Sequence, residues 1–118
     1  MLNVLKSIAL TVAIVIGFAT GPASADIVAQ GTFTGASDHI TTGTVEVIKN
    51  ADGSHTIQLG DNFSLDGAPD PRVGLGKDGK YDGATDAGIL GNLTGAQSFT
   101  VPAGVDVAQF NQVYIWCE

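Results

Sequence analysis

Sulfur is scarce in this chain, which has one cysteine, Cys117, and a single methionine at position 1. A lone cysteine cannot form an intrachain disulfide, so its thiol is free, bridged to another molecule or bound as a ligand. No Cys-x-x-Cys-His motif exists, which excludes covalently attached haem. With His39 and His55 the chain holds the minimum set for a blue-copper centre, but such centres place a histidine soon after the cysteine, and only Glu118 follows here. Any sulfur chemistry must therefore occur at Cys117.

Basic residues are also few, because the chain has five of them against twelve acidic residues. Nucleic acid and anionic membrane surfaces are therefore poor partners. No Ser-His-Asp arrangement, carboxylate pair or phosphate-binding glycine loop stands out, so a stand-alone enzyme is not expected. Asp78, Asp82 and Asp86 recur in a glycine-rich loop, but their spacing is not that of an EF-hand, and we expect no metal site there.

The one long apolar run lies at the N-terminus. Lys6 precedes the run Ile8 to Phe18, and Ala23-Ser24-Ala25 is a typical cleavage site. The run is shorter than the roughly 20 residues that a membrane span needs. We therefore expect residues 1–25 to be a signal peptide and residues 26–118 to be a secreted or periplasmic domain without a stable membrane anchor. This domain would carry four basic and twelve acidic residues, a net charge of −8.

The remaining sequence predicts short strands separated by turns. The clearest unit is a hairpin in which Val45 and Val47 share one face, Asn50 to Gly53 form the turn, and Ile57 and Leu59 return on the same side. Turn signals recur about every ten residues and no mature helix is convincing, which favours an all-β fold, a small antiparallel β-sandwich. The expected strands cover residues 27–34, 40–49, 55–59, 62–65, 72–76, 97–101 and 113–117, with a polar loop at 77–88, some core at 89, 90 and 93, and a helical turn at 105–109.

The last expected strand carries the thiol. Period-two alternation places Val113, Ile115 and Cys117 on one face, and Tyr114 and Trp116 on the other. From Tyr81 onwards the chain has no Lys, Arg or His, so any cation that stabilises a thiolate must be brought there by the fold. Without one, the cysteine acts as a small buried hydrophobe.

A series of motifs, taken in order, resembles a DM13 domain. The series consists of Gly31-Thr32-Phe33, Asp38-His39, Gly43-Thr44-Val45, Asn62 to Gly67, Ala68-Pro69-Asp70, Val73 to Gly76, Leu90 to Leu93, Gly95 to Phe99, Val101-Pro102 and Val113 to Cys117. The resemblance implies a β-sandwich related to the DOMON class of extracytoplasmic modules. It also implies electron transfer through the cysteine that aligns with Cys117, with a redox or protein partner that the sequence does not name.

Two forms of this chemistry stay open under the resemblance. The sulfur would act as a bare redox thiol or as a thiolate bound to a group such as haem, with His39 or Trp116 as a second ligand or as site lining. The alternative is a non-enzymatic extracytoplasmic binding or interaction module in which Cys117 is inert core. Domains of this kind continue past the cysteine with another strand, so we expect the sandwich to lack its C-terminal strand and to show an unpaired edge.

Overall fold

The computed structural model describes residues 2–5, 25–36 and 38–117, and the side chains from residue 25 onwards. Its elements are β1 (Leu2–Leu5), β2 (Asp26–Thr34), β3 (Thr41–Thr42), β4 (Thr44–Lys49), β5 (His55–Leu59), β6 (Ser64–Leu65), β7 (Pro71–Lys77), β8 (Lys80–Asp82), the 3₁₀ turn η1 (Gly83–Thr85), β9 (Gly88–Ile89), β10 (Gln97–Thr100), the 3₁₀ turn η2 (Val107–Gln109) and β11 (Gln112–Cys117). The expected apolar run and cleavage motif fall mostly on residues 6–24, outside the described residues. No helix in the described part is long and apolar enough to cross a membrane.

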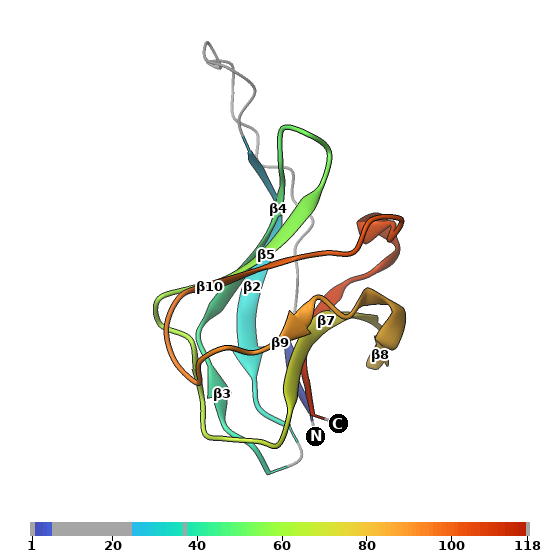
Figure 1. Cartoon of the computed structure of the whole chain (residues 1–118). Helices are drawn as coiled ribbons and strands as arrows, with labels where there is room; N and C mark the ends of the chain where they lie inside the picture. Colours follow the sequence, from blue (N-terminus) through green and yellow to red (C-terminus); the bar gives the residue numbers. More distant parts are fainter. Residues whose placement is uncertain (1, 6–24, 37, 118) are drawn as a thin grey trace.

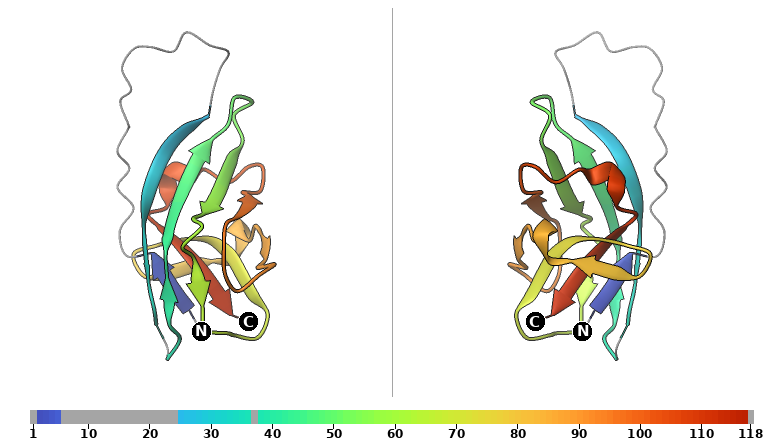
Figure 2. Two further views of the ribbon diagram at one scale, coloured as in Figure 1. Left: turned by 90° about the vertical axis from the view of Figure 1, so that its left-hand side faces the viewer. Right: turned by 90° about the vertical axis from the view of Figure 1, so that its right-hand side faces the viewer.

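The strands form one nine-stranded antiparallel sheet in the order β10-β5-β4-β2-β1-β11-β7-β8, with β9 also paired to β7. A separate two-stranded sheet joins β3 and β6. The large sheet folds over, so that β2, β4, β5 and β10 form one layer and β11, β7 and β8 form the other (Figures 1 and 2). The two layers cross face to face, which confirms the predicted all-β sandwich.

A single hydrophobic core lies between the two layers. The hairpin β4–β5 contributes its alternate residues Val45, Val47, Ile57 and Leu59, all nearly inaccessible to solvent, as the alternation predicted. Each fully buried side chain of this size contributes about 1.5–3 kcal/mol through burial. The core is completed by Ala29, Phe33, Phe63, Leu65, Val73, Leu75, Leu90, Val101, Val107, Val113 and Ile115.

The predicted strand 40–49 is divided into β3 and β4 at Gly43. This glycine has a φ of +111°, and a Cβ atom there would lie 2.5 Å from the Cα of Phe63. The chain bends at this point because only glycine accepts both the left-handed conformation and the close approach. Consequently β3 leaves the large sheet and pairs with β6.

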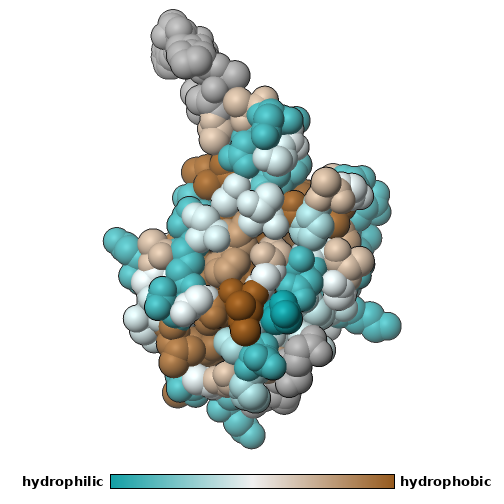
Figure 3. Space-filling view, in the orientation of Figure 1, coloured by the Kyte–Doolittle hydropathy of each residue, from teal (hydrophilic) through white to brown (hydrophobic). Residues whose placement is uncertain are grey.

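The predicted polar loop 77–88 instead contains β8, η1 and β9. The buried hydroxyl of Thr85 accepts a hydrogen bond from the backbone N–H of Leu75 at 2.7 Å, and the Asp82 carboxylate caps η1. These contacts hold the segment against β7. Ile89 and Leu93, which were expected to add to the core, are instead 50% and 45% exposed, and apolar atoms reach the surface on the face shown in Figure 3.

Strand β1 lies inside the predicted signal peptide and pairs with β11 on one side and β2 on the other. It is the blue strand beside β11 in Figure 2. With β1 in place, β11 is flanked by β1 and β7, so neither side of the last strand is unpaired in the full chain.

Candidate functional site

Cys117 is the last residue of β11, where its Cα is paired with that of Pro71 at the beginning of β7. Its side chain lies on the same face as Val113 and Ile115, as the alternation predicted, and is 7% exposed. The thiol is free of any disulfide. It therefore lies at the end of the buried face of the strand, a position with limited access to solvent.

No hydrogen bond to the Cys117 sulfur occurs within the described part of the chain. The nearest basic residue along β7 is Arg72, whose guanidinium pairs with Asp86 at 3.2 Å. Lys77 lies beyond the opposite end of β11, since Gly76 is paired with Gln112. Gln112 and Cys117 are five positions apart along the strand, about 17 Å. Neither basic residue of β7 is thus placed to stabilise a thiolate at this sulfur.

His39 lies in the turn that follows β2. Its Nδ1 is 3.2 Å from Oδ1 of Asp66, which follows β6. A hydrogen bond with the backbone of Ile40, and after it the hydrogen bond and charge of the imidazole, hold the pKa of the Asp66 carboxyl below its ordinary value. The imidazole is therefore bound to a carboxylate, and the described contacts do not join it to Cys117.

Trp116 lies on the opposite face of β11 from Cys117, within an aromatic cluster. Its ring stacks on that of Tyr81 from β8, with centroids 4.7 Å apart and planes inclined by 9°. The third ring is Tyr114, fully buried and 5.7 Å from Tyr81. Burial raises the pKa of the Tyr114 phenol, whose hydroxyl donates to Oε1 of Gln112. We call Tyr81, Tyr114 and Trp116 the aromatic cluster.

Two glycines of β7 make room for these rings. A Cβ atom at Gly74 would lie 2.7 Å from Cε1 of Tyr81, and one at Gly76 would lie 2.8 Å from Cε2 of Tyr114. The rings therefore lie directly on the backbone of β7. The sequence analysis did not identify Tyr81 as part of this cluster. The signal for a ring layer on β7 was the pair of alternate glycines, Gly74 and Gly76, together with the alternate aromatic residues Tyr114 and Trp116 of β11.

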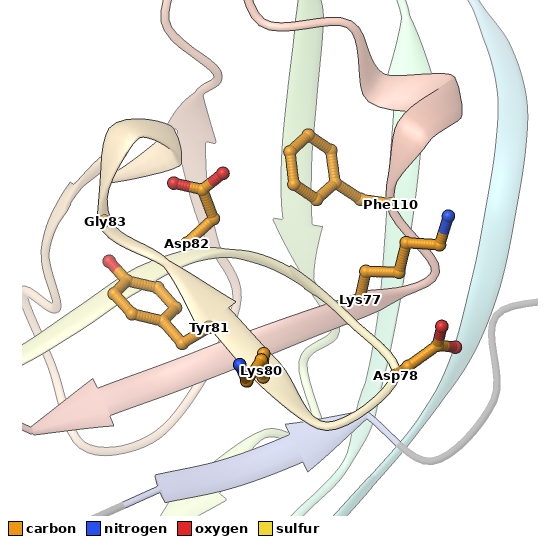
Figure 4. Close-up of a pocket in the computed structure, with 7 residues that line it drawn as sticks. All are labelled: Lys77, Asp78, Lys80, Tyr81, Asp82, Gly83 and Phe110. Carbon is orange, nitrogen blue, oxygen red and sulfur yellow. The ribbon is translucent and has the colours of Figure 1, made fainter.

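An open hollow of about 530 Å³ adjoins the aromatic cluster. Figure 4 shows its lining, which consists of Lys77, Asp78, Lys80, Tyr81, Asp82, Gly83 and Phe110. Two lysines and two aspartates leave it without net charge. Both acids already accept hydrogen bonds, Asp78 from the amide of Asn111 and Asp82 from the N–H of Ala84. Tyr81 is shared by the hollow and the aromatic cluster.

The structure separates two of the three residues singled out from the sequence. Cys117 and Trp116 face opposite sides of β11, so Trp116 cannot line a haem held by the Cys117 sulfur on the buried face. His39 is bound to Asp66 through Nδ1, and no described contact joins it to Cys117. Within the described ranges, no three His, Cys, Asp or Glu side chains gather to hold a metal ion.

Comparison with known proteins adds one match. The family model described as electron transfer DM13 matches residues 32–118, from within β2 to the end of the chain. This range contains Cys117, His39 and all three residues of the aromatic cluster. No curated protein and no solved structure matches the chain.

Proposed function

The chain belongs to the electron transfer DM13 family, and we propose that it transfers electrons outside the cytoplasm through the sulfur of Cys117. The observation that carries the proposal is that the family match spans the only cysteine of the chain. That cysteine ends a strand, so its sulfur lies at the border of the core. From this position, a small movement of the end of β11 would bring the Cys117 sulfur into contact with a partner protein.

The chemistry that we propose is that of a bare thiol. A single thiol cannot close a disulfide within the chain, so the second sulfur comes from a partner protein. The thiolate of Cys117 attacks a partner disulfide, which forms a mixed disulfide and releases one partner sulfur as a thiolate. A thiolate of a second, dithiol partner then attacks the mixed disulfide at the Cys117 sulfur, which releases the first partner with both sulfurs reduced and joins Cys117 to the second partner. The other thiolate of the second partner attacks the second partner's own bridged sulfur, forms a disulfide within that partner and releases the Cys117 thiolate. The chain thereby passes an oxidising equivalent from the first partner to the second.

An extracytoplasmic location fits this chemistry. Disulfides persist in the periplasm and outside the cell, where thiol exchange has partners, and are rare in the cytosol. The signal-like composition of residues 1–25 supports export, and β2 starts at Asp26, immediately after the expected cleavage point. The net charge of −8 for residues 26–118 also favours a soluble, weakly basic or neutral partner surface.

A second candidate function is a binding module in which Cys117 is inert. It is favoured by the burial of Cys117, a residue only 7% exposed, and by the absence of a hydrogen-bond partner for its sulfur among the residues described. Under this hypothesis the thiol contributes to packing at the end of β11. The two candidates make opposite predictions for reactivity, so one set of measurements separates them.

The test compares the unsubstituted chain with Cys117→Ser and Cys117→Ala. Electron transfer predicts that the folded protein reacts with an aromatic disulfide reagent at a measurable rate and that both substitutions abolish exchange with a disulfide-bonded partner. Cys117→Ala serves as the control for stability, because it removes the sulfur without burying a hydroxyl. Cys117→Ser buries a hydroxyl without a partner and should lower the free energy of unfolding by about 1–3 kcal/mol.

The outcomes are distinct. A Cys117→Ser protein that is less stable but keeps every redox and binding property would end the electron-transfer proposal and leave the binding module. An absorbance spectrum of the purified protein adds a check on the cofactor. A Soret band that Cys117→Ala loses would show haem ligation and would contradict the bare-thiol chemistry.

A further inference from the structure

The position of β1 in the sheet points to a binding site for another polypeptide. Leu2–Leu5 lies between β11 and β2 and runs antiparallel to both. Val4 is the one residue paired on both sides, with Tyr114 of β11 and with Thr34 of β2. The strand is therefore part of the ladder that connects the two layers of the sandwich.

Without β1, these two neighbours would face each other across the space of one strand. We call this space the strand slot, and its borders are Phe33–Thr34 of β2 and Tyr114–Trp116 of β11. Adjacent strands lie about 4.8 Å apart, so the slot is about 9.6 Å wide. Because β2 and β11 are both antiparallel to β1, they are parallel to each other, and one inserted strand satisfies both edges.

Removal of a signal peptide would take β1 away and expose both edges. β2 would keep only β4 beside it at this end, and β11 would keep only β7. The bordering residues Phe33, Tyr114 and Ile115 are buried, so the open backbone groups would adjoin the core. Unpaired edges of this kind readily bind an extended segment of another chain.

We propose that in the processed protein the strand slot binds an apolar, neutral or basic β-strand donated by a partner polypeptide. The occupant seen in this structure has that chemistry, since Leu-Asn-Val-Leu has no charge and is followed by Lys6. An acidic strand would be repelled by the net charge of −8 on residues 26–118. The inference rests on the export part of the proposed function and is independent of the chemistry of Cys117.

A second copy of the chain is a poorer occupant. In a copy cleaved before Asp26, β2 starts at the first residue, so its N-terminus has no further strand to donate. The outermost members of the large sheet are β10 and β8, which belong to folded layers. A slot that is one strand wide and closed on both sides admits a free extended segment more readily than an outer strand of another sandwich.

The first experiment empties the slot in the full chain. Val4→Pro removes the N–H and restricts the backbone of the one residue that is paired on both sides, and Val12→Pro is the matched control outside β1. The probe is the end-blocked peptide Leu-Asn-Val-Leu-Lys, and the measurements are its affinity for each protein and the Tm of each protein in its presence.

If β1 has left the slot in a tenth of the unsubstituted molecules, the Val4→Pro chain should bind the peptide about tenfold more tightly than the unsubstituted chain does. The peptide should also raise the Tm of Val4→Pro more than that of Val12→Pro.

The second experiment does not require a substituted strand to fold. A protease site is placed between residues 10 and 20, and the folded chain is cut there. The N-terminal fragment should stay with the domain through gel filtration and should be displaced by an excess of the peptide. The same cut in the Val4→Pro chain should release the fragment. Neither measurement depends on redox activity or on export, so failure here leaves the proposed function untouched.

Three outcomes would overturn the proposal. Immediate release of the fragment from the unsubstituted chain, with no binding of the peptide to either form, would mean that β2 and β11 do not hold a strand in trans. A concentration-dependent dimer of the Val4→Pro chain that the peptide does not dissociate would make a second copy the occupant. A Val4→Pro chain that stays monomeric, with unchanged Tm and no affinity for the peptide, would mean that the slot closes by direct pairing of its borders.

Discussion

The contact between β7 and the aromatic cluster can be tested with a single methyl group. In Gly74→Ala the added Cβ would lie 2.7 Å from Cε1 of Tyr81 and 3.0 Å from both the Tyr81 hydroxyl and Oγ1 of Thr85. All three atoms belong to packed side chains, and the Thr85 hydroxyl is bound to Leu75. Because the shortest of these contacts is with the ring of Tyr81, we expect relief of the clash to move Tyr81 relative to Trp116.

The expected loss of stability follows from three terms. Forcing a methyl group into a packed site costs about 1–3 kcal/mol, and loss of an aromatic pair costs about 0.5–1.5 kcal/mol. Replacing glycine with alanine returns about 0.4–1 kcal/mol through the unfolded chain. The net loss for Gly74→Ala should be about 2 kcal/mol, which lowers the urea midpoint by about 1 M for a slope near 2 kcal/mol/M.

Gly83→Ala is the matched control. A Cβ at Gly83 would meet no atom within 4 Å, and its backbone is outside the left-handed region. It carries the same unfolded-state term, so the difference between the two variants isolates the steric effect. Urea unfolding, followed by the fluorescence of the only tryptophan, measures both stability and the surroundings of Trp116.

Gly74→Ala should change the emission of Trp116 in the folded state, and Gly83→Ala should leave it as in the unsubstituted chain. Equal urea midpoints and identical emission spectra for the two variants would refute the stacking of Tyr81 over Gly74. A loss of stability in Gly74→Ala without a change in emission would place the strain at Thr85 instead.

Two further predictions concern polar contacts. Thr85→Val leaves the buried N–H of Leu75 without its acceptor and should lower the free energy of unfolding by about 1–3 kcal/mol. Thr85→Ser keeps the hydroxyl and should lower it less, and thermal or urea unfolding of the two variants measures the difference. Because the pKa of Asp66 is lowered in the folded state, its contribution to stability is complete above the unfolded pKa of about 3.9 and is lost as the pH falls through the folded pKa. The Tm should therefore decline less on acidification in Asp66→Asn, and parallel curves for the two proteins would exclude this role of the carboxylate.

The parts of the fold that the sequence predicted depend on local alternation. In the β4–β5 hairpin, Val45, Val47, Ile57 and Leu59 occupy alternate positions, and a five-residue connection (50–54) joins the two strands, so neighbours in the sheet are also near in sequence. The same alternation of side chains along a strand placed Cys117 on the buried face of β11. Side-chain direction in a strand follows from the backbone alone, which is why it could be predicted without a partner strand.

The missed elements depend on contacts between distant residues. The segment 77–88 is polar and rich in glycine, and β8 forms there because Thr85 bonds to Leu75 and Tyr81 stacks on Trp116, 35 positions along the chain. Likewise, the partner of His39 is Asp66, 27 residues away. No pattern within a short window contains such pairs, so the sequence could propose His39 for the site but could not find what holds its ring.

The pairing of β1 links the proposed strand slot to the proposed thiol. Leu2 of β1 is paired with Trp116, the residue directly before Cys117, and Pro71, which pairs with Cys117 on the other side, has no N–H to donate. The end of β11 that carries the sulfur is therefore held by its pairing with β7, by the strand in the slot and by the stacking of Trp116 on Tyr81. A strand end with few backbone hydrogen bonds opens at low free-energy cost. Occupation of the slot should thus govern how readily Cys117 becomes accessible to a redox partner.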